Sequence, residues 1–143
     1  MTTIAYRDGV LASDSRLTLG EVICTDKCKK IWRLADGGLF GASGNNESGL
    51  IVLKALQKDT PLPKLEGEMY AIHIRPNGRI YVSEGRLWDH WPEAFIACGS
   101  GQQAALAAMR SGADAVTAVK AGIALDVYSG GRVQKLELKR KRK

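Results

Sequence analysis

The first residues of the chain carry a β-hairpin pattern, which places the amino terminus inside a sheet. Apolar-rich segments at residues 2–7 and 10–14 flank the dipeptide Asp8-Gly9. An Asp-Gly pair between two such segments is a strong signal for a tight hairpin turn. Chain termini are usually loose unless they are tied into the fold. Because the pattern begins at residue 2, we expect Thr2 to hold a fixed position.

The rest of the pattern groups strands and helices in an α+β order, with helices packed on sheets. We predict strands over residues 30–34, 39–43, 69–74, 79–83, 94–98 and 133–138. We predict helices from residue 45 to the Pro-rich segment at 59–63, over 102–110 and over 113–124. A length of 143 residues suits one domain. We therefore expect a single domain over residues 1–138, followed by a basic tail over 139–143.

The basic tail accounts for most of the net charge. The chain has 21 Lys and Arg against 15 Asp and Glu, a net charge of +6, and residues 139–143 are all Lys or Arg. The remainder is nearly neutral, which argues against nucleic-acid binding by the folded part. Runs of like charge are typical of disordered, solvated ends, and we expect this of the tail. An alternative is that the chain is an unrelated basic binding module. In that case the folded part would also have to contribute to nucleic-acid binding.

Several further sequence features indicate a cytoplasmic protein without a metal or cofactor. No segment has the roughly 20 consecutive apolar residues of a membrane helix, and the amino-terminal residues lack a secretory pattern. The odd number of cysteines suits a reducing compartment. Cys24 and Cys28, even with His73 or His90 added, lack the spacing of a zinc finger. We therefore expect buried thiols, including Cys98, and structural histidines.

Threonine stands directly after the initiator methionine. A small residue there generally permits methionine removal, which would leave Thr2 with a free α-amine and a hydroxyl. An α-amine has a pKa near ~7.7–8, so a good fraction is a neutral base at pH 7. That amine can accept the hydroxyl proton as the oxygen attacks a carbonyl. The chain has no Gly-x-Ser-x-Gly, Gly-x-x-x-x-Gly-Lys or His-Glu-x-x-His motif, and this nucleophile needs none of them.

Short motifs follow Thr2 in a specific order. They are Thr2-Thr3-Ile4, Ala12-Ser13-Asp14-Ser15-Arg16-Leu17-Thr18, Lys29-Lys30-Ile31, Gly41-Ala42-Ser43-Gly44, Gly99-Ser100-Gly101 and Asp126-Val127-Tyr128-Ser129-Gly130-Gly131. In this order they resemble the catalytic β subunits of the proteasome and the bacterial HslV peptidase, which are amino-terminal nucleophile hydrolases. The sixteen-residue step from Asp14 to Lys30 and the fourteen-residue step from Lys30 to Gly44 match that family. The resemblance extends from Thr2 to about residue 138.

The resemblance implies a role for each matching residue. Thr2 would be the nucleophile, with its own amine as the general base. Lys30 would orient the threonine hydroxyl, and Asp14 would hold that lysine in place. Gly44 would donate its backbone N–H to the oxyanion, an interaction worth about 2.7–4 kcal/mol.

The resemblance also implies a shell around the amine and a substrate pocket. Ser100, Asp126 and Ser129 match residues that hydrogen-bond around the terminal amine; HslV lacks the aspartate, so this group is closer to the proteasomal form. The implied pocket residues are Leu17, Cys28, Trp32, Ala42 and Asn46. The small side chain of Ala42 would leave room for a large apolar side chain before the scissile bond.

The implied fold is a four-layer αββα sandwich, but the interval from residue 44 to 69 has room for one helix where the family has two. We therefore expect one helix to be missing. The implied function is a threonine endopeptidase that acts on peptides or unfolded proteins inside a homo-oligomeric ring, with an ATPase unfoldase as a possible partner. The alternative is a non-catalytic structural or assembly subunit of the same fold, which retained methionine would favour.

Taken singly, the motif residues also have purely structural interpretations. Asp14 and Arg16 would then form an ion pair at a hairpin end. Lys30 would be a charge that protects an edge strand, and Gly44 would end a strand before the helix.

Overall fold

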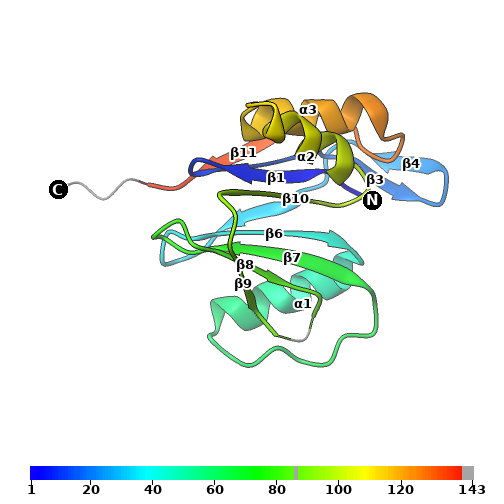
Figure 1. Cartoon of the computed structure of the whole chain (residues 1–143). Coiled ribbons are helices and arrows are strands. Elements are labelled where there is room, and N and C mark those ends of the chain that lie inside the picture. Colours follow the sequence, from blue (N-terminus) through cyan, green and yellow to red (C-terminus); the bar gives the residue numbers. More distant parts are fainter. Residues whose placement is uncertain (86, 140–143) are drawn as a thin grey trace.

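The computed structural model describes residues 1–85 and 87–139, and its elements form four layers (Figure 1). Two antiparallel sheets pack face to face in the middle. Helices α2 (Gln102–Arg110) and α3 (Ala115–Leu125) cover the outer face of one sheet, and helix α1 (Asn46–Gln57) covers part of the outer face of the other. The predicted αββα sandwich is confirmed, and among the described residues the α1 layer holds one helix.

The first sheet contains the opening hairpin at its centre. Its strands, in spatial order, are β10 (Phe95–Cys98), β1 (Ile4–Arg7), β2 (Val10–Ser13) and β11 (Gln134–Glu137). Asp8 and Gly9, both with positive φ, form the turn between β1 and β2. Residues 2 and 3 precede β1 rather than belonging to it, yet both are buried. The amino terminus is therefore tied into the fold, as the hairpin pattern predicted.

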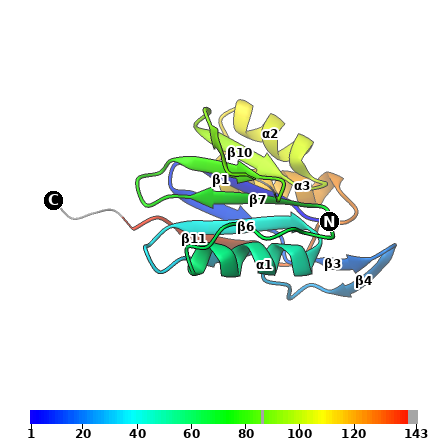
Figure 2. The same cartoon turned by 90° about the horizontal axis from the view of Figure 1, so that it is seen from below.

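The second sheet is larger, and a separate hairpin projects beside it. Its strands, in spatial order, are β5 (Ile31–Arg33), β6 (Leu39–Gly44), β7 (Met69–Ile74), β8 (Ile80–Ser83) and β9 (Asp89–Trp91). The separate hairpin consists of β3 (Leu17–Leu19) and β4 (Val22–Thr25), and Figure 2 shows it extending away from the layers.

The hydrophobic core divides into three parts that correspond to the gaps between layers. Ile4, Leu11, Leu39 and Ile72 belong to the cluster between the two sheets. Alternate residues of β6 point the other way, so Phe40 packs with α1 residues on the outer face. The third cluster joins the first sheet to α2 and α3 through small side chains, chiefly alanines. Because successive side chains of a strand point to opposite faces of the sheet, each sheet contributes side chains to the core on both of its faces.

Three strands were missed by the sequence prediction. Strand β3 has only three residues, and β4 reads Val-Ile-Cys-Thr, without alternation of apolar and polar residues; both strands are mostly exposed. Strand β9 reads Asp-His-Trp and is only three residues long. Cys24 lies exposed on β4 and Cys28 is half-buried, so the expectation of buried thiols is correct only for Cys98.

No helix in the described part of the chain is both long and apolar enough to cross a membrane. Within the same residues, no group of three or more His, Cys, Asp and Glu side chains is placed to hold a metal ion. The predicted tail falls largely on residues 140–143, which lie outside the described residues.

A matched pair of leucines tests the location of the core. Leu39 on β6 is fully buried between the sheets, whereas Leu19 on β3 is 72% exposed. Leu39→Ala is expected to lower the free energy of unfolding by about 2–5 kcal/mol, because it leaves a cavity. Leu19→Ala is expected to change it by no more than about 0.5 kcal/mol. Urea denaturation measures both, and equal effects would contradict the layer assignment.

Candidate active site

One buried carboxylate organises the residues around the amino terminus. Asp14 is fully buried directly after β2. Its Oδ1 accepts hydrogen bonds from Lys30 Nζ at 2.8 Å and from the Thr3 backbone N–H at 3.1 Å. Its Oδ2 accepts from the backbone N–H groups of Gly130 at 3.0 Å and Arg16 at 3.2 Å. Four donors from four segments satisfy this carboxylate, as a buried charge requires.

Lys30 lies between Asp14 and the first peptide bond of the chain. Its side chain is buried, and besides the ion pair with Asp14 its Nζ donates to the Met1 carbonyl oxygen at 3.1 Å. Lys30 precedes β5, so its backbone position is set by the second sheet, while Asp14 belongs to the first. The ammonium therefore bridges the two sheets at the junction of Met1 and Thr2.

A second group of polar side chains approaches Thr2 from the α3 side. The Thr2 backbone nitrogen donates to Ser100 Oγ at 3.1 Å. Ser100 Oγ in turn lies 2.5 Å from Asp126 Oδ2, which also accepts from Ser129 Oγ at 2.6 Å. Ser129 Oγ is 2.7 Å from Thr3 Oγ1, a fully buried hydroxyl. These contacts connect the amino terminus to the loop that follows α3.

The Asp126 carboxylate is held in its ionised form. Partial burial opposes ionisation, but hydrogen bonds from Ser100 and Ser129, together with the Tyr128 backbone N–H, outweigh it and hold the pKa of Asp126 below its ordinary value. A charged acceptor therefore orients both serine hydroxyls next to Thr2.

The turn Gly99-Ser100-Gly101 clamps the backbone of Thr2. The Gly101 N–H donates to the Thr2 carbonyl at 3.2 Å. Gly99 has a φ of +95°, and a Cβ atom there would lie 2.0 Å from the Thr2 carbonyl oxygen. Only glycine permits this approach. The sequence suggested no more than a tight turn for this tripeptide in isolation, and the structure shows why the turn needs glycine.

Gly44 ends β6 with a φ of +95°, and a Cβ atom there would lie 2.6 Å from the Glu68 carbonyl oxygen. The next residue, Asn45, caps α1 by accepting from the Ser48 N–H at 2.9 Å. Gly44 and the start of α1 border a narrow pocket of about 30 Å³ beside Met1 and Thr2. The pocket brings together all five predicted substrate-binding residues: Leu17, Cys28, Trp32, Ala42 and Asn46.

The contacts of Arg16 and Lys30 differ from the purely structural interpretations of these residues. Arg16 pairs through its side chain with Asp26, at 2.9 Å, so the expected Asp14–Arg16 side-chain ion pair is replaced by a backbone hydrogen bond. Lys30 is buried at the junction of the sheets, which does not fit a solvent-exposed charge on an edge strand.

Sequence reasoning missed Thr3 and the Met1 carbonyl. Thr3 reads as an ordinary strand residue in the opening hairpin, and no local signal marks its contacts with Asp14 and Ser129, which lie 11 and 126 residues away. The Met1 carbonyl belongs to the backbone, so residue types carry no information about it. The seven predicted catalytic residues, in contrast, all lie around Thr2 or on the adjoining pocket: Thr2, Asp14, Lys30, Gly44, Ser100, Asp126 and Ser129.

Comparison with known proteins places this geometry in a known fold. Neither a protein-family model nor a curated protein matches the chain by sequence. Among solved structures, eukaryotic HslV from Trypanosoma brucei has 19% identity and a TM-score of 0.73, covering 95% of this chain and 98% of that chain. BPH from Thiobacillus denitrificans has 22% identity and a TM-score of 0.70, covering 98% and 99%; its complex with epoxomicin has 23% identity and a TM-score of 0.69, covering 97% and 99%. The chain therefore has the fold of HslV and proteasome β-type subunits, so the resemblance in motif order is confirmed at the level of the fold.

Proposed function

We propose that this chain is a threonine-type endopeptidase whose nucleophile is Thr2, freed at its amino group by removal of Met1. The observation that carries the proposal is the buried Asp14–Lys30 pair, whose Nζ reaches the Met1 carbonyl at 3.1 Å, directly beside Thr2. A buried ion pair at a chain terminus needs a reason, because desolvating two charges is costly. Orientation of a nucleophile at that terminus is such a reason.

The proposed reaction is acyl transfer in two steps. The Thr2 hydroxyl oxygen attacks the peptide carbonyl, and its proton passes to the Thr2 α-amine. The tetrahedral oxyanion accepts a hydrogen bond from the Gly44 N–H. Collapse breaks the C–N bond, the leaving amine takes a proton from the α-ammonium, and an ester to Thr2 remains. Water then attacks the ester with the same amine as base, releasing the acid and restoring the hydroxyl.

The polar side chains near the Thr2 nitrogen and the pocket on the other side of Thr2 support two separate roles. Ser100 already accepts from the Thr2 nitrogen, so with Asp126 and Ser129 it would hold the amine after Met1 is removed. The pocket beside Gly44 would take the side chain before the scissile bond. Met1 itself lines that pocket, so its removal would both expose the amine and widen the space for substrate.

Assembly into a ring that encloses the site belongs to the same proposal. Large apolar side chains stay exposed on the β3–β4 hairpin and around the end of α3, including Leu19, Val22, Leu125 and Val127. Exposed apolar surface of this kind is typical of protein interfaces. We propose a homo-oligomer that degrades unfolded polypeptide in the cytoplasm, with an ATPase unfoldase as a partner. The alternative, a non-catalytic subunit, would be favoured if Met1 stays in place, because Thr2 would then have no basic amine.

Substitution of Thr2 tests the nucleophile. Thr2→Ala removes the hydroxyl and is expected to lower hydrolysis of peptide amides ending in leucine or tyrosine by at least about 10³-fold. Thr2→Ser keeps both the hydroxyl and the amine and is the matched control, expected to retain activity. Release of a fluorescent amine measures the rate. Equal rates for Thr2→Ala and the unchanged protein would overturn the proposal.

Neighbouring lysines test the role of the buried cation. Lys30→Met leaves Asp14 without its ion-pair partner, so we expect a loss of about 3–5 kcal/mol in the free energy of unfolding and loss of hydrolysis. Lys29→Met changes an exposed side chain next to it in sequence and is expected to leave stability within about 0.5 kcal/mol. Thermal unfolding identifies a temperature at which the Lys30→Met protein is folded, and the rate of hydrolysis is measured at that temperature. A folded Lys30→Met protein with full activity would contradict the assigned role.

A further inference from the structure

Thr3 follows the proposed nucleophile in the chain, and its side chain is fully buried. Its Oγ1 lies 2.7 Å from Ser129 Oγ, and its backbone N–H donates to Asp14 Oδ1 at 3.1 Å. Thr3 therefore contacts the polar residues on both sides of Thr2. Its backbone meets the buried ion pair, and its hydroxyl meets the serine of the loop that follows α3.

The number of protons on each group fixes the direction of the contact between Thr3 and Ser129. An ionised carboxylate only accepts hydrogen bonds, and a serine hydroxyl has one proton to donate. Ser129 Oγ lies 2.6 Å from Asp126 Oδ2, so the Ser129 proton is directed to the carboxylate. Because Ser129 has no second proton, the Thr3 hydroxyl is the donor in its contact with Ser129.

The same reasoning fixes the direction of the hydrogen bond at the Thr2 nitrogen. Ser100 Oγ lies 2.5 Å from Asp126 Oδ2 and 3.5 Å from the Thr2 carbonyl oxygen, so its proton goes to the carboxylate. Ser100 can then only accept from the Thr2 nitrogen, as it does at 3.1 Å. Once Met1 is removed, one proton of the amine points to Ser100, which leaves the lone pair free for the proton of the Thr2 hydroxyl.

Two glycines make room for the Thr3 hydroxyl. A Cβ atom on Gly122 would lie 2.5 Å from Thr3 Oγ1, and a Cβ atom on Gly101 would overlap the same oxygen. Gly122 lies inside α3, where glycine is a poor helix former. Its close contact with Thr3 gives a reason for glycine at this position. Helix α3 and the N-cap of α2 therefore hold the Thr3 side chain in place.

We propose that Thr3 is a positioning residue, whose hydroxyl donates to Ser129 and thereby orders the hydrogen bonds that hold the Thr2 amine. This role rests on the proposed function of Thr2 as nucleophile, and Thr3 itself touches no reacting atom. Hydrogen bonds in a connected chain strengthen one another, so the Thr3 donor strengthens the bond from Ser129 to Asp126. A carboxylate that receives stronger hydrogen bonds attracts a neighbouring proton less. The Thr3 hydroxyl therefore favours the neutral, basic form of the Thr2 amine.

Titration of the Thr2 amine by NMR tests the proposal without relying on hydrolysis. A ubiquitin fusion cut directly before Thr2 gives every variant a free amine, and the carbon-13 shifts of Thr2 are followed against pH. Thr3→Val removes the hydroxyl at similar volume, and we expect it to raise the pKa of the amine by about 0.5–1 unit. Thr3→Ser keeps the hydroxyl and is expected to retain the original pKa. Thr3→Ala also lacks the hydroxyl and replaces Thr3→Val if that variant is unfolded.

The substitution leaves every charge around Thr2 in place, so a shift would report the hydrogen bonds alone. The charged side chains that surround Thr2 include Asp14, Arg16, Lys30 and Asp126. The pH dependence of kcat/KM for peptide hydrolysis gives a second measurement. Because only the neutral amine accepts a proton, the acid limb in Thr3→Val is expected to move to higher pH by the same amount.

The matched control is Ser13→Ala, which removes another fully buried hydroxyl from the first sheet. Ser13 Oγ has no hydrogen-bond partner among the described residues, so this variant is expected to leave the amine titration unchanged. Circular dichroism confirms that each variant is folded. A Thr3→Val titration that matches the unchanged protein, or a Thr3→Ser titration that shifts equally, would overturn the proposal. Absence of hydrolysis by the unchanged protein would instead contradict the peptidase proposal, while the amine titration still decides the role of Thr3.

Discussion

The Asp14 carboxylate is the interaction on which the arrangement around Thr2 depends. Its two oxygens receive four donors, from Thr3, Arg16, Lys30 and Gly130, and none of its surface reaches solvent. These donors come from segments that are far apart in sequence, so one charge sets the relative position of the amino terminus, the start of β5 and the loop after α3. Loss of a single donor would leave a buried charge under-satisfied, which is why the geometry there has little freedom.

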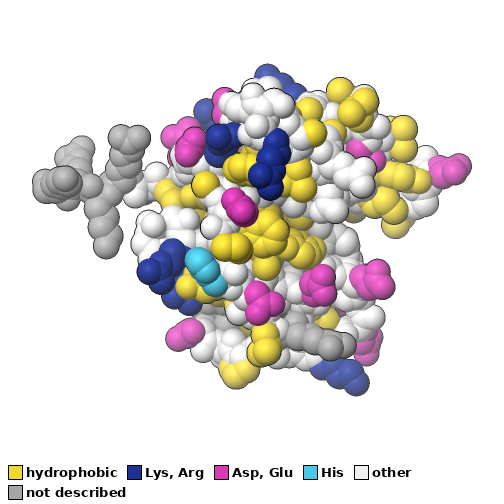
Figure 3. All heavy atoms as spheres, viewed as in Figure 1, with side chains coloured by type: hydrophobic (Ala, Val, Ile, Leu, Met, Phe, Trp, Pro, Cys, Tyr) yellow, Lys and Arg dark blue, Asp and Glu magenta, His cyan; other side chains and the backbone are white. Residues whose placement is uncertain are grey.

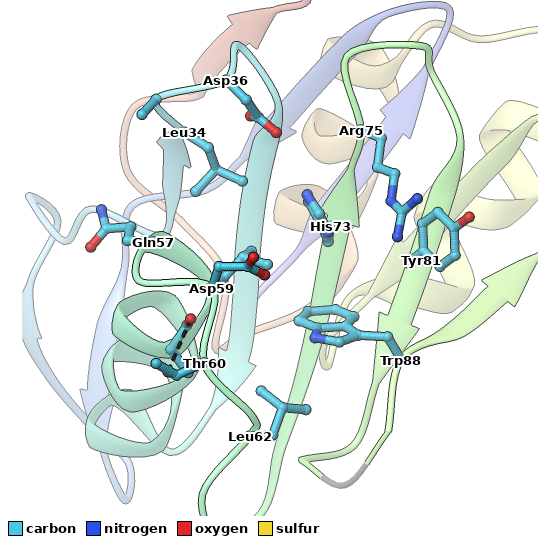
Figure 4. A pocket seen from close by; sticks show the side chains of 13 residues that line it. Leu34, Asp36, Gln57, Asp59, Thr60, Leu62, His73, Arg75, Tyr81 and Trp88 are labelled. Carbon is cyan, nitrogen blue, oxygen red and sulfur yellow. Dashed lines mark hydrogen bonds between the residues drawn. The ribbon is translucent and has the colours of Figure 1, made fainter.

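The layers of the fold position the residues around this carboxylate. Each sheet presents one side of the site: the first brings Thr2 and Asp14, and the second brings Lys30 and Gly44. Helices α2 and α3 fix the turn and loop that approach Thr2 from the other direction. The α1 layer holds a single helix, which packs on β6 and β7 and leaves part of the outer sheet face uncovered. Figure 3, a side view of the layers, shows hydrophobic side chains gathered near the middle of the face in view, with charged side chains scattered around them. A pocket of about 580 Å³ lies over β7 and β8 on the α1 side, with Leu62, His73, Tyr81 and Trp88 among its lining residues (Figure 4).

The sequence predicted most of the elements because their signals are local. The Asp8-Gly9 turn, the helical period after Asn45 and the glycines around Ser100 act over a few residues, and the corresponding elements appear within about two residues of their predicted bounds. The β3–β4 hairpin was missed because β3 has only three residues and β4 shows no alternation of apolar and polar residues. Site residues were found through motif order, which carries spacing information that no single residue has.

Other features depend on tertiary contacts and left no trace in the sequence. The contact between Thr3 and Ser129 spans 126 residues, and the pocket over β7 and β8 is lined by residues of α1, β7 and β8 that lie far apart in sequence. His73 was predicted to be structural, and its buried position in β7 is consistent with that. Its unpartnered nitrogen is visible only once the neighbouring strands are in place.

The most direct test of the central claim is the intact mass of the purified protein before and after exposure to a peptide epoxyketone. That electrophile forms a ring with both the hydroxyl and the free α-amine of a terminal threonine. The account predicts a chain that has lost Met1 and gains one adduct, which peptide mapping places on Thr2. A folded, assembled chain without Met1 that gains no adduct would contradict Thr2 as the nucleophile, and retention of Met1 would favour the non-catalytic subunit.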